Sequence, residues 1–163
     1  RYLLDDDYEP PHRVAKQVYA LRALVRNAGR EGALTGKLAT SRTVADHFGP
    51  ILRNERVESV WIVGCDVRLR VRFYRCVSRG GVARCAVTVG EILRPLVLNA
   101  TTGALMLHNH PSGDPSPSSE DIELTRHVAQ GCDLLGIRFL DHIIVGASSY
   151  LSFLDAGLLA RPG

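Results

Sequence analysis

Two histidines separated by one residue, His108 and His110, follow the apolar run 104–107. If both continue an extended strand, their side chains point to the same side, with Cα atoms about 7 Å apart. The side chain of Asn109, between them, then points to the other face. Two imidazoles placed in this way can converge on one cation.

A stiff segment with three prolines, residues 111–117, follows the histidines. Ser118 or Ser119 is placed to cap the next helix. With Ser118 as the cap, Asp121 stands three positions later, which is the spacing of a capping box. Because this helix begins close to the end of the strand, its first turn can bring Asp121 back to the two imidazoles. The alternative is that Ser118 and Asp121 only cap the helix and that the histidines bind no metal.

Two imidazole nitrogens and one carboxylate oxygen suit Zn²⁺, and a site with three protein ligands leaves one position open for water. Zinc lowers the pKa of such a water to about 7, so hydroxide is available at neutral pH. A second acid, which is not a ligand, would then move protons. The chemistry alone does not choose between Glu55, Glu58 and Glu91 for this acid.

Composition indicates one compact domain. The chain has 163 residues, of which 45% are hydrophobic and 23% are charged, enough apolar residues for a core. The net charge is +3, and the middle third is basic while the last third is acidic. The four cysteines form no C-x-x-C pair, so we expect reduced thiols and a cytoplasmic location. No apolar run approaches the roughly 18 residues that span a bilayer, so we expect no membrane contact.

The hydrophobic pattern interleaves helices with strands. It predicts helices over 12–28, 41–52, 91–100 and 118–135, and strands over 60–63, 67–74, 82–89, 104–108, 137–145 and 150–154. Pro50 counts against continuity of the second helix. Residues 1–40 form an N-terminal arm, an amphipathic helix and a linker, and residues 41–163 form the main domain. The interleaving predicts an α/β or α+β fold with one mixed sheet.

The stretch from His108 to Asp121 resembles the H-x-H-P…S-x-x-D motif of the JAMM/MPN+ metalloproteases. Its wording, HNHPSGDPSPS, is similar to the RadC branch of that superfamily. Further likeness, including LDHIIVG near the end of the chain, extends the resemblance over roughly residues 41–159.

The resemblance implies an MPN/JAB domain, a curved mixed β-sheet flanked by helices, of the cytidine-deaminase-like kind. It also implies roles. His108, His110 and Asp121 match the Zn²⁺ ligands. Ser118 matches the serine that helps to hold the oxyanion of the tetrahedral intermediate. Glu58 matches the glutamate that takes the water proton and passes it to the leaving amine.

The chain departs from the family pattern in three places. Val89-Gly90-Glu91 stands where the family usually has Pro-Arg-Glu, and Arg94-Pro95 is expected to interrupt the helix that follows. The DNA-binding helix-hairpin-helix module that usually precedes the domain is not recognisable in residues 1–40. Asp141 and His142 lie in an apolar strand and are expected to be buried and hydrogen-bonded rather than to bind metal, with support of the site as an alternative.

Three functions compete. The first is hydrolysis of a peptide or isopeptide bond, with a peptide or a ubiquitin-like protein as substrate. The second is a metal-dependent nuclease or a DNA-repair accessory protein, suggested by a row of arginines, Arg68, Arg70 and Arg72, on one face of the strand 67–74. The third is a non-catalytic MPN scaffold. A zinc deaminase is excluded because its H-x-E and P-C-x-x-C motifs are absent. The sequence leaves the oligomeric state open.

Overall fold

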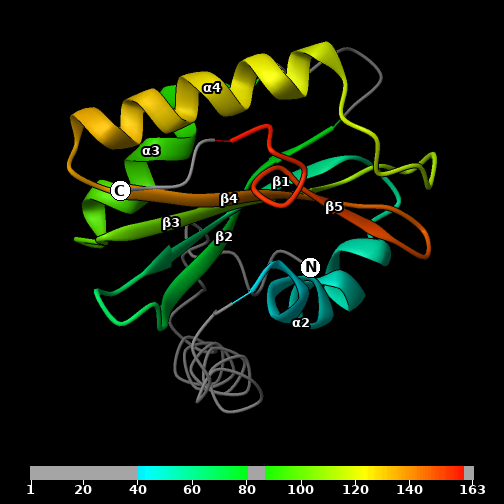
Figure 1. The fold of residues 1–163 in the computed structure, drawn as a ribbon, viewed down its shortest axis with the longest axis horizontal. Helices are drawn as coiled ribbons and strands as arrows, with labels where there is room; N and C mark the ends of the chain where they lie inside the picture. The colour runs from blue at the N-terminus through cyan, green and yellow to red at the C-terminus, as the bar shows by residue number, and fades with distance from the viewer. Residues whose placement is uncertain (1–39, 81–86, 160–163) are drawn as a thin grey trace, which may run out of the picture. The chain divides into compact units, whose positions relative to one another are not determined.

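The computed structural model describes residues 40–80 and 87–159. In chain order, its elements are α2 (Ser41–Arg53), β1 (Ser59–Cys65), β2 (Val71–Arg79), α3 (Val89–Leu98), β3 (Gly103–Asn109), α4 (Ser119–Leu134), β4 (Arg138–Val145) and β5 (Tyr150–Ser152). The strands form one sheet in the order β2-β1-β3-β4-β5. Strands β3 and β4 are parallel, and the other neighbours are antiparallel. The helices α3 and α4 lie on one face and α2 lies on the other (Figure 1). This is the expected mixed α+β fold.

Strand β3 lies at the centre of the sheet and is buried along its whole length. Side chains alternate between the two faces of a strand, so Ala104 and Met106 join the core under α3 and α4, whereas Leu105 faces α2. That core contains ten buried residues: Val60, Ile62, Ile92, Leu96, Ala104, Met106, Val128, Cys132, Ile137 and Phe139. The alternation continues into the histidines, so the core fixes which way they point.

The strand predicted over 67–74 begins later than expected, at Val71, and continues beyond the predicted end to Arg79. The reason is a turn built on Asp66. Its Oδ1 accepts the backbone N–H groups of Arg68 and Arg70, at 2.8 and 3.0 Å, and Leu69 has a positive φ of 60°. Side-chain acceptors of this kind compete with strand pairing. Arg68 and Arg70 therefore lie in a turn, and the predicted arginine row on one strand face is wrong.

Prolines do not end the helices that contain them. Pro50 lies inside α2 and Pro95 inside α3, so the expected interruption of the second of these helices is wrong. Each proline removes one helical hydrogen bond, but burial of the apolar face, including Phe48 and Leu96, offsets that loss. No helix within the described ranges has both the length and the apolar character needed to cross a bilayer.

Two further predictions meet the edges of the described residues. The N-terminal helix over 12–28 and almost all of the linker after it lie outside them, as do residues 82–86 of the strand predicted over 82–89. The last positions of that strand lead into α3, whose cap is Thr88. The division of the chain at residues 40 and 41 stays a prediction.

Candidate metal centre

The end of β3 places the two histidines. His108 is its penultimate residue and is 2% exposed. His110 follows the strand, but its N–H donates to the carbonyl of Val145 on β4, at 3.0 Å, so the chain stays extended for one more residue. The Nε2 atoms of the two rings lie 2.8 Å apart. The H-x-H spacing thus brings both rings to one point, as the strand period predicts.

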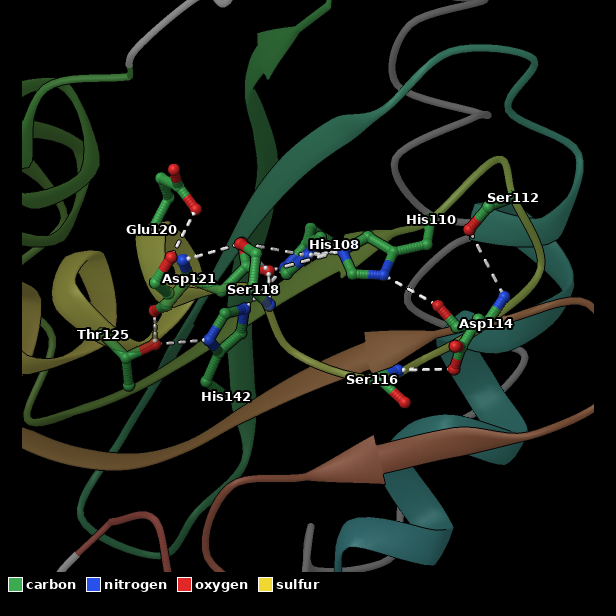
Figure 2. A network of polar contacts seen from close by, with 11 residues as sticks. His108, His110, Ser112, Asp114, Ser116, Ser118, Glu120, Asp121, Thr125 and His142 are labelled. Carbon is green, nitrogen blue, oxygen red and sulfur yellow. Dashed lines mark hydrogen bonds and ion pairs between the residues drawn. The ribbon is translucent and has the colours of Figure 1, made fainter.

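The first turn of α4 brings Asp121 to the same point. Ser118 caps the helix, and its Oγ accepts the N–H of Asp121. In return, Oδ2 of Asp121 accepts from the N–H and hydroxyl of Ser118, at 2.8 and 2.7 Å. Oδ1 lies 3.4 Å from Nε2 of His108, and Oδ2 lies 3.4 Å from Nε2 of His110. The capping box therefore also aims the carboxylate at both imidazoles (Figure 2).

Glu58 completes a group of four. One ligand atom from each of Glu58, His108, His110 and Asp121 lies within 4.8 Å of the others. The pairing of β1 with β3 sets this position, because Val60 pairs with His108, and two residues further Glu58 falls opposite His110. The Glu58 side chain is exposed, whereas His108 and Asp121 are buried.

The other two acids that could have moved protons are engaged elsewhere. Glu55 accepts from the guanidinium of Arg79 at 2.6 Å. Glu91 accepts from Thr88 in the capping box of α3. Of the three glutamates left open by the sequence, the structure places Glu58 in the cluster.

Asn109 points away from the cluster, as expected, and holds the backbone on both sides of Glu58. Its Oδ1 accepts from the N–H and hydroxyl of Ser59, at 2.9 and 2.7 Å, and its Nδ2 donates to the carbonyl of Val57 at 3.0 Å. The carbonyl of Glu58 itself accepts from Gly80 at 2.7 Å. The residue between the histidines thus fixes where the glutamate leaves the sheet.

Behind His108 lies a second, buried histidine. Nδ1 of His108 is 2.7 Å from Nε2 of His142, whose Nδ1 is 2.6 Å from Oγ1 of Thr125. The hydroxyl of Thr125 also lies 2.5 Å from the backbone carbonyl of Asp121. His142 is buried and hydrogen-bonded, as expected, and it does not belong to the group of four. Thr125 was not among the predicted site residues, although it stands four residues after Asp121, on the same side of a helix.

Asp141, the neighbour of His142 in β4, holds β5 and the residues just after it against β4. Its carboxylate accepts from the hydroxyl of Ser152 at 2.5 Å, and from the N–H groups of Leu154 and His142 at 2.9 and 2.8 Å. Burial raises the pKa of this carboxyl, and the three hydrogen bonds oppose that rise. Asp141 is therefore buried and hydrogen-bonded, as expected.

Burial keeps the inner histidines neutral. It lowers the pKa of His108 to about 4, with the neighbouring His110 acting in the same sense and Asp121 opposing it. Burial also takes the pKa of His142 well below its ordinary value. A neutral imidazole keeps one lone pair, which is the form that binds metal.

The donor atoms fit a divalent metal ion. Nδ1 of His110 lies 2.8 Å from the carbonyl oxygen of Asp114, which can only accept, so Nδ1 carries a proton and a neutral His110 has its lone pair on Nε2. That lone pair faces Nε2 of His108 across 2.8 Å, an arrangement that needs a cation or a shared proton. Two imidazoles with carboxylates form a ligand set suited to zinc. The group can therefore hold a metal ion.

Comparison with known proteins identifies relatives of this chain. Residues 38–158 match the RadC-like JAB domain. A UPF0758 protein of Geobacter sulfurreducens is 35% identical over 133 residues, which cover 82% of this chain and 58% of the relative. One of Trichlorobacter lovleyi is 40% identical over 116 residues, 71% of this chain and 50% of the relative. One of Methanosarcina mazei is 34% identical over 123 residues, 76% and 54% respectively.

The chain spans between half and two thirds of the length of these curated relatives. The matched region includes every strand and helix described above. The RadC resemblance of the histidine segment is thus confirmed, and the mixed sheet of five strands is consistent with the α+β fold of JAB and MPN domains. This chain belongs to the RadC-like JAB domain family.

Proposed function

We propose that this domain is a zinc-dependent hydrolase of the JAMM type, which cleaves a peptide or isopeptide bond. The observation that carries the proposal is the convergence of Glu58 with His108, His110 and Asp121. The JAMM pattern calls for a glutamate beside two histidines and an aspartate, and these four positions supply it.

In this proposal His108, His110 and Asp121 hold the metal. Bound zinc supplies a Lewis acid that polarises the scissile carbonyl and lowers the pKa of water to about 7. Glu58, which is exposed beside the ligands, takes a proton from the attacking water at a carboxylate oxygen. It then gives that proton to the nitrogen of the leaving amine.

Ser118 is the proposed donor to the oxyanion of the tetrahedral intermediate. Its hydroxyl proton now points to Oδ2 of Asp121. For the proposed role it must turn toward the substrate oxygen, while the backbone N–H of Ser118 keeps its bond to Asp121. A hydroxyl that donates to this oxygen stabilises the charge that develops there in the transition state.

The first test is metal content. The purified chain should contain about one zinc ion, and His110→Ala or Asp121→Ala should remove it. Glu123→Gln, on the exposed side of α4, serves as the matched control and should retain the metal. Wild-type protein that takes up no zinc from solution would contradict the site.

The second test separates the functions. The zinc-loaded chain is incubated with ubiquitin-like fusion proteins and, in parallel, with labelled single- and double-stranded DNA. We expect cleavage of the fusion proteins, blocked by a chelator and restored by zinc. Cleavage of DNA alone would favour a nuclease, and zinc binding without cleavage of either would favour a scaffold.

A further inference from the structure

The contacts behind His108 fix the positions of several protons, beginning at the backbone carbonyl of Asp121. A carbonyl oxygen can only accept. It lies 2.5 Å from Oγ1 of Thr125, a distance at which two oxygens repel unless a proton lies between them. The single hydroxyl proton of Thr125 is therefore directed at Asp121. The side of Oγ1 that faces His142 is left with a lone pair.

That lone pair faces Nδ1 of His142 at 2.6 Å. Because Thr125 has no second proton to give, Nδ1 of His142 must be the donor. His142 is fully buried, and its two ring nitrogens contact Thr125 and His108 rather than a carboxylate. A buried charge without an ionic partner is costly, so the ring is neutral and its other nitrogen, Nε2, carries a lone pair. The proton on His142 is thus held on the nitrogen that faces α4.

Nε2 of His142 lies 2.7 Å from Nδ1 of His108. An acceptor there requires His108 to carry its proton on Nδ1. A neutral His108 then has its lone pair on Nε2, the atom that faces His110 and Asp121. Each step leaves the next group one choice, and Figure 2 shows the chain of contacts running from the helix to the cluster.

We propose that Thr125 and His142 are positioning residues that hold His108 in the Nδ1–H tautomer, so that its Nε2 is presented to the metal. The hydrogen bonds run in one direction, from His108 to His142, to Thr125 and to the carbonyl of Asp121. This series of hydrogen bonds, the relay, ends on Asp121, whose carboxylate lies beside the two histidines of the cluster. One buried chain therefore connects two of the three proposed ligands, and sets the tautomer of one of them.

This inference rests on the metal-holding part of the proposed function and not on hydrolysis, so it can be measured before any metal is added. Long-range ¹H–¹⁵N spectra of the metal-free chain at neutral pH report which ring nitrogen of each histidine is protonated. The expected result is a proton on Nδ1 of both His108 and His142. Absence of the proton from Nδ1 of either histidine would overturn the relay.

Variants then test the direction of the relay. Thr125→Val removes the acceptor for Nδ1 of His142, so the proton of His142 should move to Nε2 and that of His108 to Nε2 in turn. Zn²⁺ affinity, measured by competition with a chromophoric chelator, should fall about 10- to 100-fold, as for other supports of metal ligands. Thr125→Ser keeps the hydroxyl and should restore both the tautomers and the affinity.

A matched control separates this effect from a simple loss of stability. Thr101 is also buried, and its hydroxyl donates to the carbonyl of Leu96 at 2.9 Å, but it precedes β3 and lies at the end of the strand away from His108. Thr101→Val should destabilise the fold without changing zinc affinity or the tautomer of His108. Equal zinc affinity in Thr125→Val, Thr125→Ser and wild type would overturn the proposal.

The outcomes also distinguish this inference from the proposed hydrolase. Protons on Nδ1 of both histidines, lost in Thr125→Val, support the relay even if the chain cleaves no peptide. Zinc-dependent cleavage together with Nε2–H tautomers would support the hydrolase and overturn the relay.

Discussion

The two sides of the cluster are built differently. On the inner side, the ring of His108 is buried and has contacts at both nitrogens, with His142 and then Thr125 behind it. On the outer side, Glu58 has an exposed side chain, and the fold holds its backbone through Asn109 instead. One side fixes a ring, and the other fixes only the point from which a carboxylate extends.

This difference matches what each side would do. A metal ligand loses affinity if its lone pair turns away, so a buried ring whose other nitrogen is held by a hydrogen bond is an advantage. A group that takes a proton from water and gives it to a leaving amine must reach both, so its side chain has to move.

The largest effect is expected at the outer side, at Glu58. Glu58→Gln keeps the size of the side chain but removes its ability to accept a proton. The rate of peptide cleavage should fall about 10²- to 10⁴-fold, while zinc content and the free energy of unfolding stay near those of wild type. Metal analysis and kinetics with Glu123→Gln as control check this. Unchanged cleavage would assign the base to another residue.

Lowering the pH should destabilise the inner side, where the buried histidines lie. The pKa of His108 is about 4 in the folded chain, against an ordinary value of 6.5, and the pKa of His142 is lowered too. Between these values the unfolded chain binds more protons, so the free energy of unfolding must decrease as the pH falls. His108 alone would contribute about 3 kcal/mol between pH 7 and pH 4.

Denaturant unfolding of the metal-free chain at pH 7, 6 and 5 measures this loss. The decrease should begin as the pH falls through about 6.5, where the unfolded histidines take up protons. Bound zinc should make the decrease steeper, because protons compete with the metal for the imidazoles. A free energy of unfolding that rises as the pH falls from 7 to 5 would contradict the neutral, buried state of the inner histidines.

Asn109→Ala tests how the outer side is held. The change leaves the buried N–H and hydroxyl of Ser59 without their acceptor, which should lower the free energy of unfolding by about 2 kcal/mol. The cleavage rate should fall more than zinc affinity does, since the backbone of Glu58 is released. Asn54→Ala is the control. It removes an exposed hydrogen bond from the side-chain amide to the carbonyl of Pro50 and should lower the free energy of unfolding by less than about 1 kcal/mol.

Much of the cluster could be predicted from sequence because its rules are local. The strand period aims His108 and His110 to one side, and the spacing of a capping box brings Asp121 into the first turn of the helix. Both patterns lie within one stretch of fourteen residues, from His108 to Asp121. The structure brings these three side chains together as expected.

The rest depends on pairing between distant segments. Glu58 is selected over Glu55 by the register of β1 against β3, and His142 comes next to His108 through the parallel pairing of β3 with β4. No local pattern contains these registers. The predicted start of β2 was also wrong. The alternation of apolar and polar residues through 67–74 does not reveal that the Asp66 side chain accepts backbone N–H groups there.

The smallest expected effect concerns the residue that belongs to both fold and site. Ser118→Ala removes the cap of α4 and one donor to Asp121. Thr88→Ala does the same to the capping box of α3, whose acid, Glu91, lies outside the cluster. Each change should lower the free energy of unfolding by about 1 kcal/mol, as measured by denaturant unfolding.

Only one of the two changes should reach the metal. In Ser118→Ala the carboxylate of Asp121 is less firmly aimed, so zinc affinity should decrease, whereas Thr88→Ala should leave it unchanged. If the hydroxyl of Ser118 also stabilises the oxyanion, the turnover number at saturating zinc should fall as well. Two variants with equal stability, equal zinc affinity and equal turnover would reduce Ser118 to a helix cap, and the aim of Asp121 would then come from the backbone of α4 alone.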